Sequence, residues 1–136
     1  MDIRRVVQVD STGCGIACVA MITGKSYKDI KQVGLENDIF STKKAFYTDT
    51  ADIVKMLKIL GIPTEKGRKV SNWDTIKSIS IVGINYRESS DTWHWAVYIP
   101  NEEEGYVLDP NKKIKTDKRT DFSRMKLRSY IPVNLL

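Results

Sequence analysis

Long apolar runs are missing from this chain of 136 residues. A transmembrane helix needs about 20 consecutive, mostly apolar residues, and no stretch here comes close, so we expect no membrane span. The first residues carry charge but lack the apolar core and the small-residue cleavage site of a secretory signal. We therefore expect a soluble, cytoplasmic protein, with secretion by a specialised system that removes no leader as the alternative.

Cysteine and histidine are scarce. The chain has two cysteines, Cys14 and Cys18, and a single histidine, His94. Two cysteines four residues apart cannot build a disulfide framework, and a metal site would need further ligands. We therefore expect no metal, and we interpret Cys18 as a buried helix residue.

Acidic residues are fewer than basic ones. The chain has 22 lysines and arginines against 17 aspartates and glutamates, which gives a formal net charge of +5. Much of the excess lies at 111–115 and at Lys118, Arg119, Arg124, Lys126 and Arg128. A basic face attracts nucleic acid, anionic membranes or acidic proteins, but no interleaved aromatic residues or nucleic-acid motif accompany this one. We therefore predict a solvated basic surface and no nucleic-acid partner.

The first half of the chain has helical patterns. An apolar run over 14–22 is followed by a glycine, which predicts a short buried helix. Ser26 is a suitable N-cap for a second helix that extends to about Glu36. A third helix begins at Thr48 or Thr50. Its inward face is predicted from the helical spacing of Ile53, Met56, Leu57 and Leu60.

The second half has the period of strands. Runs rich in β-branched and aromatic residues lie at 79–86, 93–99, 105–109 and 130–133, which indicates an antiparallel sheet. A short helix over 71–77 and an edge strand over 62–66 are also expected. No repeat or linker interrupts the chain. We therefore predict a single domain over residues 1–136, of the α+β class, with N-terminal helices packed on a C-terminal antiparallel β-sheet.

Cys14 is a candidate nucleophile. It opens the first predicted helix, and the N-terminus of a helix favours the thiolate, which is the reactive form of a cysteine. Gly13 and Gly15 flank it and allow a tight turn and the close approach of a substrate backbone. Taken alone, a cysteine in an apolar helix is more often an inert core residue, so the prediction depends on a partner base.

His94 is the candidate base. It lies in a strand where Trp93, Trp95 and Val97 alternate to one face, and the histidine takes the other face beside the small Ala96. A lone strand histidine is commonly a structural residue, so this signal is weak by itself.

Asp109 is the candidate partner of the histidine. The strands on either side of the polar loop 100–104 are expected to pair as a hairpin. Counting symmetrically from this loop puts His94 opposite Pro110, and a shift of one residue brings Asp109 onto the face of His94. An aspartate there would fix the imidazole tautomer. An aspartate before a proline is also an ordinary turn residue, so the register stays open.

Taken together, these residues resemble a known family. Gln8 and the segment 10–22, which reads Asp-Ser-Thr-Gly-Cys-Gly-Ile-Ala-Cys-Val-Ala-Met-Ile, look like the start of papain-like cysteine peptidases of the bacteriocin-processing type, which remove double-glycine leaders. Residues 94–98 and 105–110 are similar to that family's histidine and aspartate blocks. The resemblance spans residues 6–110 and implies a papain-like cysteine protease fold.

The resemblance also implies roles for four residues. Cys14 would be the nucleophile, His94 the general base and then acid, and Asp109 the residue that orients the histidine. Gln8 would join the Cys14 backbone N–H in an oxyanion hole. The implied activity is that of a cysteine peptidase or related amide hydrolase, which acts on a peptide or protein through a thioester and needs no cofactor.

Other uses of the same chemistry stay open. The best-known members of the family are fused to membrane transporters, whereas this chain reads as a free-standing member, so association with a transporter or secretion system is one option. Related domains act as glutamine deamidases among bacterial effectors, or as transpeptidases. A non-catalytic papain-like binding domain is the alternative from a different class, although such a module would not need these four side chains in this order.

Overall fold

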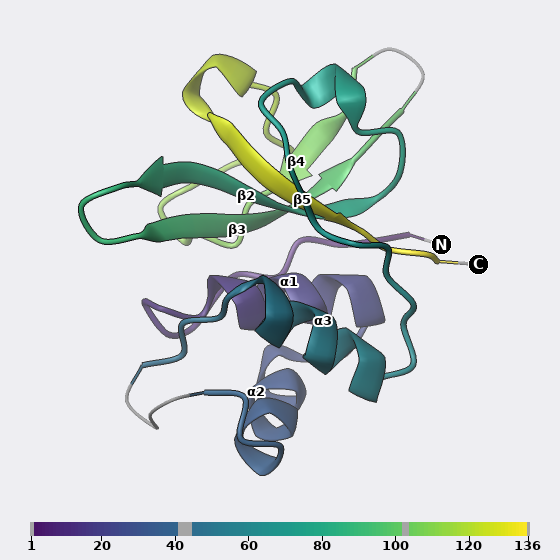
Figure 1. Cartoon of the computed structure of the whole chain (residues 1–136), viewed down its shortest axis with the longest axis vertical. Coiled ribbons are helices and arrows are strands. Elements are labelled where there is room, and N and C mark those ends of the chain that lie inside the picture. Colours follow the sequence, from purple (N-terminus) through teal and green to yellow (C-terminus); the bar gives the residue numbers. More distant parts are fainter. Residues whose placement is uncertain (1, 41–44, 102–103, 136) are drawn as a thin grey trace.

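The computed structural model describes residues 2–40, 45–101 and 104–135. In these residues three α-helices lie on one side of a five-stranded antiparallel sheet (Figure 1). The helices come first in the chain and the sheet second. The α+β class and its order of helices and sheet are therefore confirmed.

The helices begin and end where local signals place them. Helix α1 (Cys14–Thr23) stops at Gly24, whose left-handed backbone with φ of 72° suits a glycine. Helix α2 (Tyr27–Glu36) is capped by the Ser26 side chain, which accepts a hydrogen bond from the Asp29 N–H. Helix α3 (Thr50–Ile59) begins at one of its two predicted starts, with Asp49 and Asp52 forming a capping box.

The sheet has the order β1-β5-β2-β3-β4. Its strands are β1 (Arg68–Lys69), β2 (Ser80–Arg87), β3 (Thr92–Ile99), β4 (Tyr106–Leu108) and β5 (Leu127–Pro132). All four main predicted strands are present. Residues 102–103 of the loop between β3 and β4 lie outside the described residues.

Two minor predictions are wrong. The edge strand expected over 62–66 lies at 68–69 instead, and Thr64 makes only an isolated bridge to Val133. Pro63 supplies no N–H to a ladder, which disfavours a strand around it. The helix expected over 71–77 is reduced to a single 3-10 turn, Trp73–Thr75.

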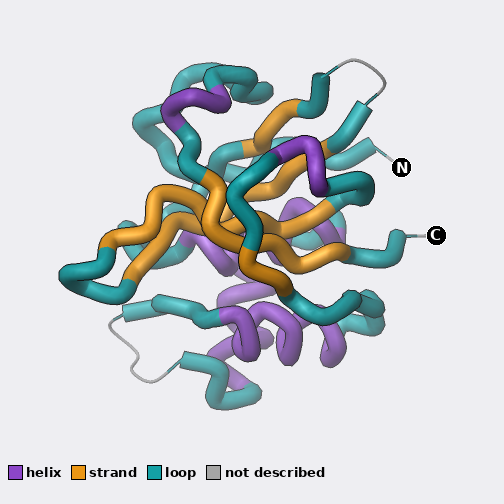
Figure 2. The backbone as a smooth tube through the Cα atoms, turned by 45° about the horizontal axis from the view of Figure 1, so that its top comes forward, coloured by secondary structure: helices purple, strands orange, loops and turns teal. Residues whose placement is uncertain are grey.

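Side chains of β3 divide between the two faces of the sheet as the alternation predicts. Trp95 and Val97 join the core that the sheet shares with the helices, and Trp95 Nε1 donates to the Thr48 carbonyl at 2.9 Å. Ala96 and Tyr98 join a second apolar cluster on the other face. Figure 2 shows the short helical turns that cover this face, opposite α1–α3. In the part of the chain described, no helix is long and apolar enough to span a membrane.

Gly15 lies at a close approach between α1 and α3. A Cβ at this position would collide with Thr48 Oγ1 and come within 3.0 Å of Ile53 Cδ1. We therefore expect Gly15→Ala to lower the free energy of unfolding by about 1–3 kcal/mol, although alanine is otherwise the better helix former. Chemical denaturation would measure this change.

A double-mutant cycle with Thr48→Ala supplies the control. Thr48 Oγ1 is buried and has no hydrogen-bond partner among the described residues, so its removal should relieve part of the collision. We expect Gly15→Ala to cost less in the Thr48→Ala background than alone. Equal costs in the two backgrounds would contradict this account of the glycine.

Candidate active site

Cys14 is the first residue of α1. Gly13 precedes it as the N-cap and offers no side chain to the free backbone N–H groups of the first turn, which also contains no acidic residue. These N–H groups and the helix dipole favour a negative charge at this point. Cys14 is partly exposed, whereas Cys18, one turn further along, is fully buried. Burial raises the pKa of the Cys18 thiol.

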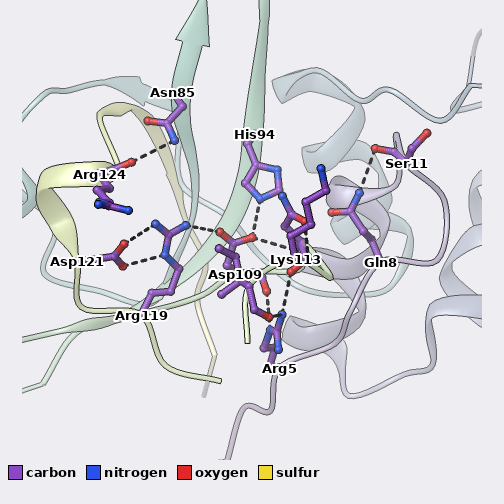
Figure 3. A network of polar contacts seen from close by, with 12 residues as sticks. Arg5, Gln8, Ser11, Asn85, His94, Asp109, Lys113, Arg119, Asp121 and Arg124 are labelled. Atoms are coloured by element: carbon purple, nitrogen blue, oxygen red, sulfur yellow. Dashed lines mark hydrogen bonds and ion pairs between the residues drawn. The ribbon is translucent and has the colours of Figure 1, made fainter. Parts of the chain in front are cut away.

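His94 projects from β3 with its imidazole between two partners. Its Nε2 lies 2.7 Å from Asp109 Oδ1 (Figure 3), and its side chain lines the same cleft as Cys14. Because Nε2 faces the aspartate, Nδ1 is the ring atom left for the thiol. Burial lowers the pKa of His94, but its interactions with Asp109 and Cys14 outweigh it and raise the pKa to about 9.

Asp109 reaches the histidine through a one-residue difference in register. Val97 pairs with Leu108, so the next residue, Asp109, lies opposite Ala96 and on the same face of the sheet as His94. Symmetric counting would place Asp109 opposite Trp95, on the other face. Burial raises the pKa of Asp109, but hydrogen bonds from His94, Asn111 and Arg119 hold the pKa below its ordinary value. The aspartate is therefore ionised, and the Nε2–H of His94 donates to it.

Arg119 was not predicted as part of the site. The sequence pattern predicts that Arg119 lies on a solvated basic surface. This prediction is wrong, since Arg119 is only 8% exposed. Its Nη1 donates to Asp109 Oδ2 at 2.7 Å, and its other two nitrogens bind both oxygens of Asp121. Nothing in the local sequence separates Arg119 from the exposed lysines around it, because its burial depends on a partner ten residues away.

Arg5 ties the N-terminal segment to the loop that follows Asp109. Its guanidinium donates to the backbone carbonyls of Asp109 at 2.6 Å, Asn111 at 2.9 Å and Ile114 at 2.7 Å. The Gln8 N–H donates to the Pro110 carbonyl at 2.9 Å. Hydrogen bonds therefore link the segment before α1 to the segment after β4 beside the site (Figure 3).

Gln8 is buried in the turn that leads to Cys14. Its amide nitrogen donates to the carbonyls of Asp10 at 3.0 Å and Ser11 at 3.1 Å. Its Oε1 is buried and has no hydrogen-bond partner among the described residues. The nitrogen is thus shared with the turn, and any contact to an oxyanion would compete with these two bonds.

Cys14 and His94 line an open cleft of about 340 Å³. Tyr47, Trp93 and Arg87 form other parts of its wall. Of the aromatic residues of β3, Trp93 faces this cleft, while Trp95 lies in the core. Within residues 2–40, 45–101 and 104–135, no group of three or more histidines, cysteines and acidic residues is placed to hold a metal ion.

Comparison with known proteins identifies a family. The sequence profile of the peptidase C39 family matches residues 2–125. No curated protein is detectably similar in sequence to the chain.

Solved structures with a similar fold are peptidase domains. The peptidase domain of Streptococcus ComA, a bi-functional ABC transporter involved in a quorum sensing pathway, has a TM-score of 0.71 and 19% identity, and the match covers 99% of this chain and 100% of that one. A double glycine motif protease from an AMS/PCAT transporter, in complex with the leader peptide, gives 0.69 and 18%, covering 97% and 91%. The peptidase domain of Streptococcus mutans ComA gives 0.64 and 18%, covering 97% and 99%. At these identities, the likeness shows a shared fold.

Proposed function

Because the chain belongs to the peptidase C39 family, and is therefore a cysteine-type peptidase with a papain-like fold, we propose that it hydrolyses a peptide or protein through a Cys14-His94-Asp109 triad. The observation that supports this most is the 2.7 Å contact between His94 Nε2 and Asp109 Oδ1, with Cys14 at the N-terminus of α1 in the same cleft. A nucleophile, a base and an orienting carboxylate in this order are what acyl transfer by a thiol requires.

The first half of the reaction forms a thioester. With the His94 pKa at about 9, the imidazole holds a proton at neutral pH beside the Cys14 sulfur. The thiolate attacks the scissile carbonyl, a C–S bond forms, and the carbonyl electrons move onto oxygen. As the tetrahedral intermediate collapses, the C–N bond breaks and His94 gives its proton to the leaving amine.

The second half returns the enzyme to its starting state. His94, now neutral, accepts a proton from water as the water oxygen attacks the thioester carbonyl. The C–S bond breaks, the new carboxylic acid leaves, and the Cys14 thiolate is restored beside the protonated imidazole. Asp109 stays ionised throughout and stabilises the imidazolium whenever it forms. One water is consumed for each peptide bond.

The oxyanion is proposed to be held by the Cys14 N–H and the Gln8 amide. Removing one donor of such a hole costs about 10²–10³ in kcat. We expect a loss of this size for Gln8→Ala in peptide hydrolysis. Alkylation of Cys14 by iodoacetamide forms no oxyanion, so its rate should stay close to that of the wild type.

These two readouts separate a catalytic role of Gln8 from a structural one. If Gln8 mainly braces the turn through Asp10 and Ser11, then Gln8→Ala should slow hydrolysis and alkylation together. A variant that hydrolyses peptide at the wild-type rate would exclude Gln8 from the oxyanion hole.

The first substrates to test follow from the similar structures. One of these is a double glycine motif protease that was solved with a leader peptide, and others are peptidase domains of transporters. We propose that this chain cleaves peptides after a double-glycine motif, and that a peptide transporter is the partner to look for.

Mass spectrometry of such peptides tests the proposal. Incubation with the wild type should give two fragments cut after the second glycine, and Cys14→Ala should give none. A peptide whose second glycine is replaced by alanine serves as the matched control and should remain largely intact. An intact backbone with release of ammonia from a glutamine would instead indicate a deamidase, and no change in any peptide would contradict the proposed cleavage.

A further inference from the structure

The carboxylate of Asp109 is enclosed by donors on both oxygens. The residue is only 1% exposed. Its Oδ1 accepts from His94 Nε2 at 2.7 Å and from the Asn111 N–H at 2.9 Å, and its Oδ2 accepts from Arg119 Nη1 at 2.7 Å. A carboxylate taken out of water needs such compensation to stay ionised. Arg119 provides the only full positive charge, apart from the histidine itself, among the described donors to this carboxylate.

Arg119 is itself fixed from two sides. Its backbone N–H and carbonyl form hydrogen bonds of 2.8 and 2.9 Å with the carbonyl and N–H of Val107, two residues before Asp109. Its Nε and Nη2 bind the two oxygens of Asp121 at 2.9 and 2.7 Å. The guanidinium therefore has one nitrogen left for Asp109, held at a defined position and angle (Figure 3).

We propose that Arg119 is a positioning residue of the active site, which links Asp109 to Asp121 and so sets the orientation and the charge of the aspartate that holds His94. This inference rests on the proposed function of the triad and deepens it. Arg119 also lines the cleft, but each of its three guanidinium nitrogens is bound to Asp109 or Asp121. It acts through Asp109.

Two physical effects of Arg119 can be separated. Its planar fork restricts rotation of the Asp109 carboxylate, and this effect depends on guanidinium geometry, which lysine lacks. Its positive charge opposes proton binding by the whole cluster of Cys14, His94 and Asp109, and this effect depends on charge alone. Asp121 acts in the opposite direction, because its negative charge offsets part of the charge of Arg119.

Other charged and titratable groups surround the same cluster. They are Arg5 at the Asp109 carbonyl, Cys18 of α1, Arg87 of β2 and Tyr47 on the cleft wall, and Arg124, whose charge acts on Asp121. All of them remain in place when residue 119 or 121 is changed, so a difference between variants reports on Arg119 and Asp121.

The test compares Arg119→Met, Arg119→Lys and Asp121→Asn across a range of pH. For each, the rate of Cys14 alkylation by iodoacetamide and the rate of peptide hydrolysis are measured, with thermal unfolding as the check on folding. The exposed Lys126, in the same segment, supplies the control Lys126→Met. Asp121 is itself largely exposed, with 45% of its side chain accessible, so Asp121→Asn should fold even where Arg119→Met does not.

We expect Arg119→Met to slow hydrolysis by about ten- to a hundredfold, the worth of a charge-assisted hydrogen bond. The inflections of its alkylation profile are the pH values at which the rate of Cys14 alkylation changes most steeply. Both should move to higher pH by about half to one unit, because a positive charge that opposes protonation of the cluster is gone. Arg119→Lys should keep the wild-type inflections while still losing hydrolysis. Asp121→Asn should move the inflections to lower pH, and Lys126→Met should change neither property.

The opposite results would overturn the proposal. If Arg119→Met and Asp121→Asn both keep the wild-type inflections, Arg119 does not set the charge of the site, and any loss of rate with lower thermal stability reflects the fold alone. A wild type that alkylates rapidly but cleaves no peptide would contradict the proposed function instead. The alkylation profiles would still decide the role of Arg119 in that case.

Discussion

Replacing Cys14 with alanine is expected to abolish peptide hydrolysis, with a loss in kcat of about a thousandfold or more, since the proposed thioester cannot form without the Cys14 sulfur. Cys14 is partly exposed at the start of α1, so the variant should unfold at nearly the wild-type temperature. The measurement is the initial rate of fragment formation from a cleaved peptide, at equal concentrations of folded protein.

Cys18 provides the matched control for this experiment. It lies four residues later on the same helix, is 0% exposed, and has a thiol whose burial raises its pKa. Cys18→Ala removes a sulfur atom of the same kind and should keep nearly all activity, at some cost in stability from the small cavity. If Cys14→Ala retained activity, or if Cys18→Ala lost it without unfolding, the assignment of the nucleophile would be wrong.

The N-terminal part of the site could be predicted because its signals are local. An apolar run that begins at Cys14 and stops at Gly24 defines α1 whatever surrounds it, and places the cysteine at a helix N-terminus. The face of His94 followed from alternation in β3, which needs only neighbouring residues. In both cases the sequence period and the burial pattern agree.

The rest of the site depends on contacts between segments that are distant in the sequence, and local patterns do not encode such contacts. Symmetric counting misplaced Asp109 by one residue, because the pairing of β3 with β4 is set by the loop and by packing on both faces. The local pattern around Arg119 indicates a surface residue, since its partners Asp109 and Val107 are identified only once the chain has folded back on β4. The role of Gln8 came from the family resemblance alone, because one glutamine in a turn carries no periodic signal.

The contacts of His94 and Asp109 determine which of the two residues holds the proton. The hydrogen bond to Asp109 raises the pKa of His94 so that it carries a proton at neutral pH, which suits the release of the amine. A buried carboxylate alone would take up protons itself, but the donors around Asp109 keep its pKa low. The proton therefore resides on the imidazole, next to the sulfur, rather than on the aspartate.

The second large effect is expected for His94→Ala. An unassisted thiol ionises with a pKa near 8.5, so at pH 6 only about 0.3% of it is thiolate. In the wild type His94 is protonated in this range, because the pKa of the imidazole is raised to about 9, and in the proposed mechanism it lies beside the Cys14 sulfur. We therefore expect the variant to react with iodoacetamide about a hundredfold more slowly than the wild type at pH 6, with the difference shrinking as the pH approaches 9.

The sign of the pH dependence makes this prediction specific. Below about pH 9 His94 keeps its proton and supports both the thiolate and the departure of the amine, and above it the proton is lost. Wild-type hydrolysis should therefore fall above about pH 9, while the thiolate continues to react with iodoacetamide. Urea-unfolded wild type is the control, and it should label with the pH profile of an ordinary thiol. Slow labelling at pH 6 in both the folded wild type and His94→Ala would mean that Cys14 is not activated, and the triad mechanism would have to be abandoned.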